Sequence, residues 1–269
     1  MSIDKLNNTS VVVCSYHRTL DPAVNYDGHH IIRSFHEENF PNFHVLFDDH
    51  HGYSEEYVSE KYGGPNVCIY NDEDFANHGF DKPISSYHFW GSHQNPKYFF
   101  AHFRMLTFFL KNPNYEYYWF FDDDVKFEGS LKGLLENYSD VDDDFIVIQA
   151  FKKEDYPDYP NVSVINSRME GSRGHWLGHC PGPGDNFKST ERHIGSFYPV
   201  VRYSKKAMEH LMKLHEEGYY GYSEGFVPTS LASDGSKVSS MMDEHNNFFI
   251  KNEVCTLLHK GQKFTWEWL

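Results

Sequence analysis

Short apolar runs alternate with longer polar or amphipathic segments along the first half of the chain. Residues 10–15 (SVVVCS), 43–47 (FHVLF) and 66–70 (NVCIY) have the length and the β-branched or aromatic content of strands. Between the first two, apolar positions in 29–39 recur at helical spacing, and Pro41 ends that helix. This alternation predicts an α/β fold with a mostly parallel central sheet flanked by helices.

The same rhythm continues to residue 150 and then stops. Residues 167–190 are rich in Gly, Pro, Arg and His and have no periodicity, which in a compact domain is typical of a functional or disordered loop. No internal repeat or low-complexity linker divides the chain, so we expect residues 1–269 to form one domain. Further strands are expected at 117–121, 145–150, 197–202 and 253–258, and helices at 97–110, 131–138 and 205–217.

Charge and composition narrow the choice of partners. With 24 basic and 39 acidic residues the formal net charge is −15, which disfavours nucleic acid because backbone contacts need clustered Lys and Arg. An acidic protein that binds an anionic nucleotide needs a local counter-charge, and a divalent cation is the simplest one. Aromatic residues make up 17% of the chain, which suits a cleft that stacks bases or sugar rings, although most single rings are expected in the core.

Four cysteines stand far apart without a CxxC pair, which excludes zinc-knuckle spacing and a disulfide framework: Cys14, Cys68, Cys180 and Cys255. Residues 1–10 are polar and lack the apolar segment of a signal peptide. No stretch approaches the roughly 20 apolar residues of a membrane span. We therefore expect a cytoplasmic chain without a membrane span.

The most specific feature is the run YYWFFDDDVKF, residues 117–127. Five bulky residues predict a buried strand, and ligands of open α/β sheets bind off the carboxyl ends of strands. In an extended segment Asp122 and Asp124 point the same way, and two hard oxygen donors suit Mg²⁺ or Mn²⁺ shared with phosphate oxygens. A second acidic run, 142–144, precedes its strand and is interpreted as a solvated turn.

An apolar strand that closes in Asp-Asp-Asp-Val after a Rossmann-like first half resembles the DxD motif of GT-A glycosyltransferases. The resemblance implies a single GT-A domain, with a nucleotide-binding half at about 1–125 and an acceptor-binding and catalytic half at about 126–269. It implies metal-dependent transfer of a sugar from a nucleotide-sugar donor, with a UDP-sugar favoured, to a glycan or other carbohydrate acceptor. The expected cofactor is Mn²⁺ or Mg²⁺.

The resemblance also implies where the donor binds. The loop after the first strand holds the base and ribose in that fold, and polar groups after the next strands contact them. A residue in the helix before the motif commonly faces the donor, and here His102 and Arg104 lie there. The expected donor-binding residues are Ser15, Tyr16, Arg18, Asp48, Asn71, Arg104, Asp122 and Asp123, with Asp49 as a further candidate.

A third metal ligand in this family is commonly a histidine from the C-terminal part. His259 follows the expected strand 253–258 directly, as the aspartates follow theirs, and His245 is the alternative. The expected metal ligands are therefore Asp122, Asp124 and His259. Imidazole beside two carboxylates would favour Mn²⁺ over Mg²⁺.

An inverting transferase needs a general base for the acceptor hydroxyl, usually a carboxylate. Glu224 lies among aromatic residues and glycines, where many inverting members have an acidic residue at the start of a helix. Asp185 and Asp243 are the alternative bases, and in a retaining enzyme Glu224 would bind acceptor hydroxyls instead. The loop 171–190 is interpreted as a lid.

Two other functions remain open on the sequence. A sugar nucleotidyltransferase has a similar layout, but it normally carries a Gly-rich loop directly after the first strand, where this chain reads Cys-Ser-Tyr-His-Arg. A non-catalytic module that binds a nucleotide or carbohydrate would keep the aromatic cleft without turnover. Metal-dependent nucleotide release would separate the transferase from such a module.

Overall fold

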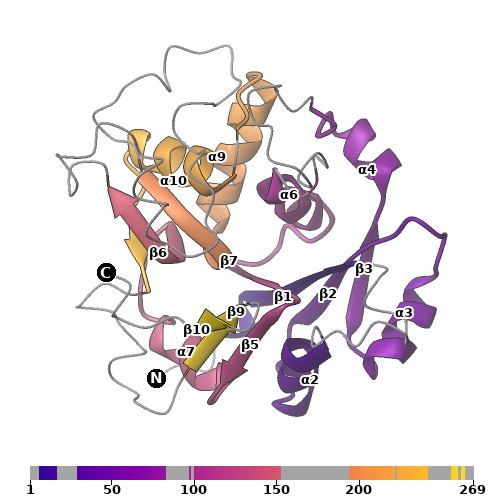
Figure 1. The fold of residues 1–269 in the computed structure, drawn as a ribbon. Coiled ribbons are helices and arrows are strands. Elements are labelled where there is room, and N and C mark those ends of the chain that lie inside the picture. The colour runs from indigo at the N-terminus through magenta and orange to yellow at the C-terminus, as the bar shows by residue number, and fades with distance from the viewer. Residues whose placement is uncertain are drawn as a thin grey trace.

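A computed structural model describes residues 6–16, 29–82, 97, 100–152, 194–221, 223–241, 256–259 and 262–263. They form a seven-stranded sheet in the order β3-β2-β1-β4-β7-β6-β8 and a three-stranded sheet in the order β10-β9-β5 (Figure 1). The strands of the large sheet are β1 (Thr9–Tyr16), β2 (Phe43–Asp48), β3 (Asn66–Tyr70), β4 (Tyr117–Asp122), β6 (Phe145–Lys152), β7 (Ile194–Ser204) and β8 (Val238–Ser240). Those of the small sheet are β5 (Val125–Glu128), β9 (Thr256–His259) and β10 (Gln262–Lys263).

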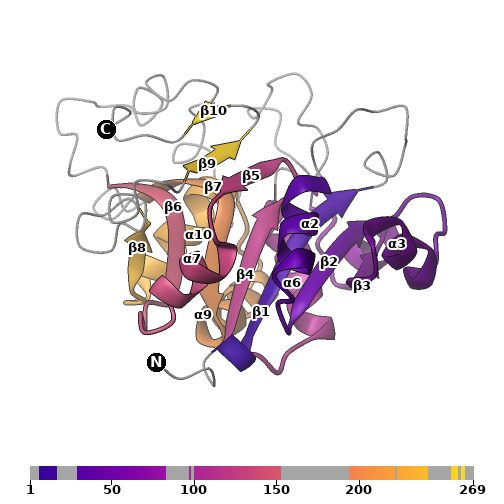
Figure 2. The same cartoon turned by 90° about the horizontal axis from the view of Figure 1, so that it is seen from below.

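The large sheet is mostly parallel, as predicted. β3, β2, β1 and β4 pair in parallel, β7 is antiparallel to both of its neighbours, and β6 pairs in parallel with β8. The carboxyl ends of the first four strands therefore lie along one edge of the sheet. The small sheet lies at that edge, because β5 follows β4 after a turn (Figure 2).

Helices cover both faces of the large sheet. One face packs against α6 (Ala101–Lys111), α9 (Lys205–Glu216) and α10 (Ser223–Ser233), and its core includes Val12, Phe120 and Phe103. The other face packs against α2 (His29–Glu37), α3 (Glu55–Tyr62) and α7 (Leu131–Asn137), and its core includes Val13 and Phe121. Helix α4 (Asp72–Asn77) follows β3. Neighbouring residues along a strand thus belong to the cores on opposite faces of the sheet, because side chains alternate sides along a strand.

Local sequence sets several helix ends. Ser204 accepts a hydrogen bond from the N–H of Ala207 at the start of α9. Gly218, at a φ of 89°, follows the end of that helix, as predicted, and its N–H donates to the His215 carbonyl. Cys14 and Cys68 are free and buried within β1 and β3, whereas the other two cysteines lie outside the described residues. Among the helices that the structure describes, none combines the length and apolarity needed to cross a membrane.

Candidate functional site

The aspartate run lies where its sequence position predicted. Strand β4 is buried from Tyr118 to Phe121 and ends at Asp122, which is level with Cys14 of β1. The next two residues form a turn that leads into β5. The alternation of an extended strand therefore ends at Asp122, so the expectation that Asp122 and Asp124 point the same way stays a prediction.

Asp122 faces the α6 side of the sheet and has a cationic neighbour. Nη2 of Arg104, a residue of α6, lies 3.4 Å from Asp122 Oδ1. The Arg104 side chain is 10% exposed and that of Asp122 is 33% exposed, so the carboxylate still reaches solvent. Helix α6 thus supplies a fixed positive charge beside the aspartate run. A guanidinium in this position can bind a phosphate group.

Asp123 faces the opposite side and is buried. Its Oδ2 accepts a hydrogen bond of 3.1 Å from Ser15 Oγ, which also lies 2.9 Å from the Tyr62 hydroxyl. Burial, followed by the charges of Asp124 and Asp122, raises the pKa of the Asp123 carboxyl well above its ordinary value. A cation held by the two flanking aspartates would reduce this repulsion. The side chains of Ser15 and Asp123, both expected to bind the donor, contact each other.

The pairing of β5 with β9 brings the C-terminal histidine to the aspartate run. In this antiparallel ladder His259 is the partner of Val125, the residue that follows Asp124. Only the backbone of His259 is described, and within the described part of the chain no three His, Cys, Asp or Glu side chains are arranged to hold a metal ion. Two carboxylates with open positions suit a divalent cation that completes its shell with substrate phosphates and water.

Glu224 lies in the first turn of α10, at the start of a helix as the resemblance implied. Its carbonyl accepts a hydrogen bond of 2.9 Å from Ser196 Oγ of β7. The ring of Tyr198, also on β7, is buried and experiences the charges of Arg104, Asp122 and Glu224. Burial, the largest influence, raises the pKa of the Tyr198 hydroxyl well above its ordinary value. Tyr198 therefore lies within electrostatic reach of both Asp122 and Glu224.

A buried pair joins the helix of Arg104 to the helix of Glu224. Ser223 Oγ accepts from the backbone N–H of His102 at 3.2 Å and lies 2.9 Å from His102 Nδ1. His102 lies in the helix where the resemblance commonly places a donor-facing residue, but its ring is 1% exposed, and burial lowers its pKa to about 3. The imidazole is therefore a neutral packing residue that fixes α10 against α6.

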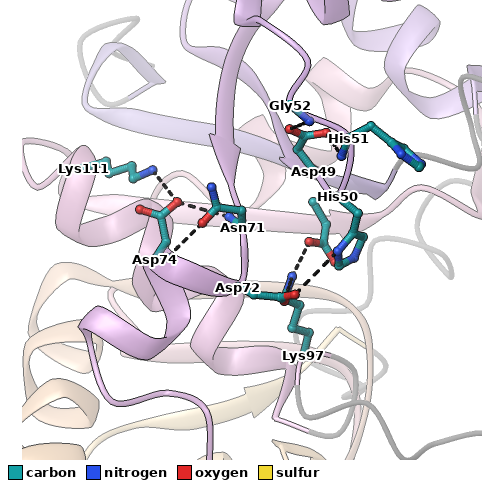
Figure 3. A network of polar contacts seen from close by, with 10 residues as sticks. Asp49, His50, His51, Gly52, Asn71, Asp72, Asp74, Lys97 and Lys111 are labelled. Atoms are coloured by element: carbon teal, nitrogen blue, oxygen red, sulfur yellow. Dashed lines mark hydrogen bonds and ion pairs between the residues drawn. The ribbon is translucent and has the colours of Figure 1, made fainter.

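A second polar group lies at the carboxyl ends of β2 and β3 (Figure 3). The buried ammonium of Lys97 is 2.5 Å from Asp48 Oδ1 and 2.7 Å from Asp72 Oδ1. It also lies 5.3 Å from the ring centre of Tyr70. His50 Nε2 is 3.4 Å from Asp48 Oδ2, and its Nδ1 is 3.8 Å from Asp72 Oδ2.

This group changes the interpretation of Asp48. The Asp48 side chain is 3% exposed and its charge is compensated by Lys97, whereas Asp72 is 78% and His50 33% exposed. A ligand at this edge would therefore meet Asp72 and His50 before Asp48. Lys97, His50 and Asp72 could not be found from the sequence, because nothing in it links a lysine to a carboxylate 49 positions away.

Two other candidates have local structural roles. Asn71 is the N-cap of α4, where it accepts from the N–H of Asp74 and forms a reciprocal capping box with that residue (Figure 3). Asp49 accepts hydrogen bonds from the N–H groups of the three residues 51–53 and so shapes the loop after β2. A capping signal, Asn followed three residues later by Asp, was present in the sequence and would have identified the role of Asn71.

The second acidic run has structural roles, and the predicted solvated turn applies to Asp142 but not to Asp144, which is buried. Asp142 pairs with Lys237 at 2.8 Å on the surface, and Asp144 accepts from Ser204 Oγ at 3.0 Å. Several expectations lie outside the described residues, so they stay predictions: Arg18, Asp185, Asp243, His245, the lid 171–190 and the side chains of Tyr16 and His259.

Comparison with known proteins finds only distant likenesses to solved structures. The chain matches no protein-family model and no curated protein sequence. A core-mannan synthase from Aspergillus fumigatus in its Mn/GDP form is 12% identical, with a TM-score of 0.43, over 94% of this chain and 75% of that one. Mouse xyloside xylosyltransferase 1 is 11% identical, with a TM-score of 0.46, over 86% and 84% of the two chains. A cytidylyltransferase from Leptospira borgpetersenii is 12% identical, with a TM-score of 0.40, over 89% and 78%. These likenesses do not assign a reaction to this chain.

Proposed function

We propose that this chain is a metal-dependent glycosyltransferase that moves a sugar from a nucleoside diphosphate donor, with a UDP-sugar favoured, to a hydroxyl group of a glycan or other acceptor. The observation that carries the proposal is the contact between Asp122 and Arg104 at the carboxyl end of a buried strand. A carboxylate that can bind a cation and a guanidinium that can bind phosphate stand together at the edge where α/β sheets hold their ligands.

The donor set fits a divalent cation. Asp122 and Asp124 supply hard oxygen atoms, and the ladder between β5 and β9 brings the backbone of His259 beside them. Carboxylates with one imidazole suit Mn²⁺, and carboxylates alone suit Mg²⁺ equally well. When bound, such a cation offsets the charge of the diphosphate and of the departing nucleotide.

Other residues of the chain would contact the phosphates and the nucleoside of the donor. Arg104 compensates negative charge on the phosphates, and its low exposure keeps it in place. The nucleoside end of the donor would lie toward the ends of β1, β2 and β3, where His50 and Asp72 are the exposed members of the polar group around Lys97.

Glu224 is the proposed general base. It would accept the proton of the acceptor hydroxyl as that oxygen attacks the anomeric carbon, while the bond from that carbon to the phosphate oxygen breaks and the nucleoside diphosphate leaves. Direct attack of this kind inverts the configuration. The hydrogen bond from Ser196 to the Glu224 carbonyl, and the link from Ser223 to His102, fix the helix end that carries this carboxylate.

The experiment follows release of nucleoside diphosphate from UDP-, GDP-, CDP- and ADP-sugars, with Mn²⁺, with Mg²⁺ and with EDTA. The proposal predicts slow release from one nucleotide class, dependent on the metal and faster with a suitable acceptor. Release of pyrophosphate from a nucleoside triphosphate and a sugar 1-phosphate would instead identify a nucleotidyltransferase. Binding without any turnover would identify a non-catalytic module.

A further inference from the structure

A chain of three buried side chains leads from helix α3 to the aspartate run. The Tyr62 hydroxyl is 2.9 Å from Ser15 Oγ, and Ser15 Oγ donates to Asp123 Oδ2 at 3.1 Å. The three residues are 6%, 2% and 5% exposed. Because the single hydroxyl proton of Ser15 goes to Asp123, Tyr62 must donate to Ser15. Hydrogen bonds in such a chain polarise one another in the same direction.

The phenol at the start of this chain is held in place. Helix α3 begins at a Ser54 cap that accepts from the N–H of Tyr57 and ends at Gly63, whose φ is 88°. Tyr62 is the last residue of this helix, and its ring packs edge-on against Phe47 of β2, with ring centres 6.3 Å apart. Its hydroxyl therefore has a fixed position relative to the ends of β1 and β4.

The turn after β4 is thus held from both faces of the sheet. Arg104 contacts Asp122 on the α6 face, and Ser15 contacts Asp123 on the α3 face. We propose that Tyr62 is a positioning residue for metal binding, which acts through Ser15 and Asp123 to set the turn that presents Asp122 and Asp124. This inference rests on the proposed function, and it assigns a role to a helix that the resemblance did not involve.

The test measures how tightly the full chain binds Mn²⁺, alone by the electron paramagnetic resonance signal of the free ion, and with UDP, GDP, CDP or ADP by calorimetry. Removing partners behind a metal ligand commonly weakens metal affinity by 10- to 100-fold. Tyr62 would act on the metal ligands only through Ser15 and Asp123, so for Tyr62→Phe we expect Mn²⁺ affinity to fall by about three- to tenfold. In a Ser15→Ala background, Tyr62→Phe should cause no further loss, because the connection is already broken.

Tyr118→Phe is the matched control. It also deletes a buried hydroxyl, which donates to the Asn112 carbonyl at 2.9 Å, and it lies on β4 itself. We expect Tyr118→Phe to lower the melting temperature about as much as Tyr62→Phe does, without a change in Mn²⁺ affinity. Equal Mn²⁺ affinity of Tyr62→Phe and the wild type, or equal losses in Tyr62→Phe and Tyr118→Phe, would overturn the inference. A wild-type chain that binds no Mn²⁺, with or without these nucleotides, would overturn the proposed function and this inference together.

Discussion

His102 and Ser223 connect the two helices that border the candidate site, with His102 Nδ1 2.9 Å from Ser223 Oγ. Helix α6 carries Arg104 beside the aspartate run, and helix α10 carries Glu224 in its first turn. His102 and Ser223 are 121 positions apart in the sequence, and both are buried. The geometry of the proposed general base relative to the donor charge therefore depends on this pair.

Replacing Ser223 should destabilise the fold, whereas a similar change on the same helix should not. Ser223→Ala leaves the N–H of His102 without this acceptor, and we expect a loss of about 1 kcal/mol in the free energy of unfolding. Ser230 is also buried on α10, but among the described residues its hydroxyl has no hydrogen-bond partner. Ser230→Ala should be neutral or slightly stabilising in the same urea titration. Equal losses in both variants would contradict the role given to Ser223.

Acid should destabilise the protein through its buried histidines. Burial lowers the pKa of His44 to about 4 and that of His102 to about 3, from an ordinary value of 6.5. Above pH 6.5 both rings are neutral in the folded and the unfolded chain, so they add no pH dependence. Below it the unfolded chain binds protons that the native state does not, and each ring removes about 1.4 kcal/mol per pH unit until its folded-state pKa is reached.

Urea unfolding between pH 7.5 and 4.5 measures this dependence. His44→Gln should reduce the slope of stability against pH, because one depressed pKa is removed. His36→Gln, an exposed position on α2, is the control and should keep the wild-type slope. A wild-type stability that stays constant from pH 6.5 to 4.5 would contradict this assignment.

Lys97 should matter far more for stability than a lysine on the surface. Lys97→Met leaves Asp48 buried without its cation, and removing one partner of a buried ion pair commonly costs about 3–5 kcal/mol. Lys132→Met, which removes only a 3.9 Å surface pair with Glu136, should change stability by less than about 1 kcal/mol. The double variant Lys97→Met with Asp48→Asn should recover part of the loss. Chemical denaturation measures all three, and equal effects at Lys97 and Lys132 would argue against a buried ion pair.

Glu224→Gln should abolish transfer while donor binding persists. Loss of a general base commonly lowers the rate by about 10²- to 10⁴-fold, and the amide keeps the size of the side chain. The measurement compares kcat for transfer with the affinity for the metal and nucleotide. Glu209→Gln, an exposed change on α9, should leave both unchanged. A fully active Glu224→Gln variant would show that another group accepts the proton.

The sequence predicted those elements in which apolar residues form a short run or recur at regular spacing. Strand β3 has the predicted bounds, Asn66–Tyr70, and the aspartates end β4 as expected. The residue pattern alone did not predict helix α10, because eight of its residues are buried, Pro228 lies within it, and no polar face marks a helical period.

The long-range contacts of the site could not be predicted. The approach of Lys97 to Asp48, of Tyr62 to Ser15, and of His102 to Ser223 depends on tertiary packing between distant segments. Sequence alone identified residues at strand ends, because parallel strands share one carboxyl edge. It did not show which of these side chains would face solvent and which, like Asp48 and Asp123, would be buried.

The most direct test of the metal site uses the two aspartate runs of the same chain. Melting temperature is measured for the wild type, Asp124→Asn and Asp142→Asn with UDP-, GDP-, CDP- and ADP-sugars, each with and without Mn²⁺. We predict that the wild type and Asp142→Asn are stabilised by one nucleotide class only when Mn²⁺ is present, and that Asp124→Asn folds but shows no such shift. An undiminished Mn²⁺-dependent shift in Asp124→Asn, or no shift in the wild type with any nucleotide, would contradict the account.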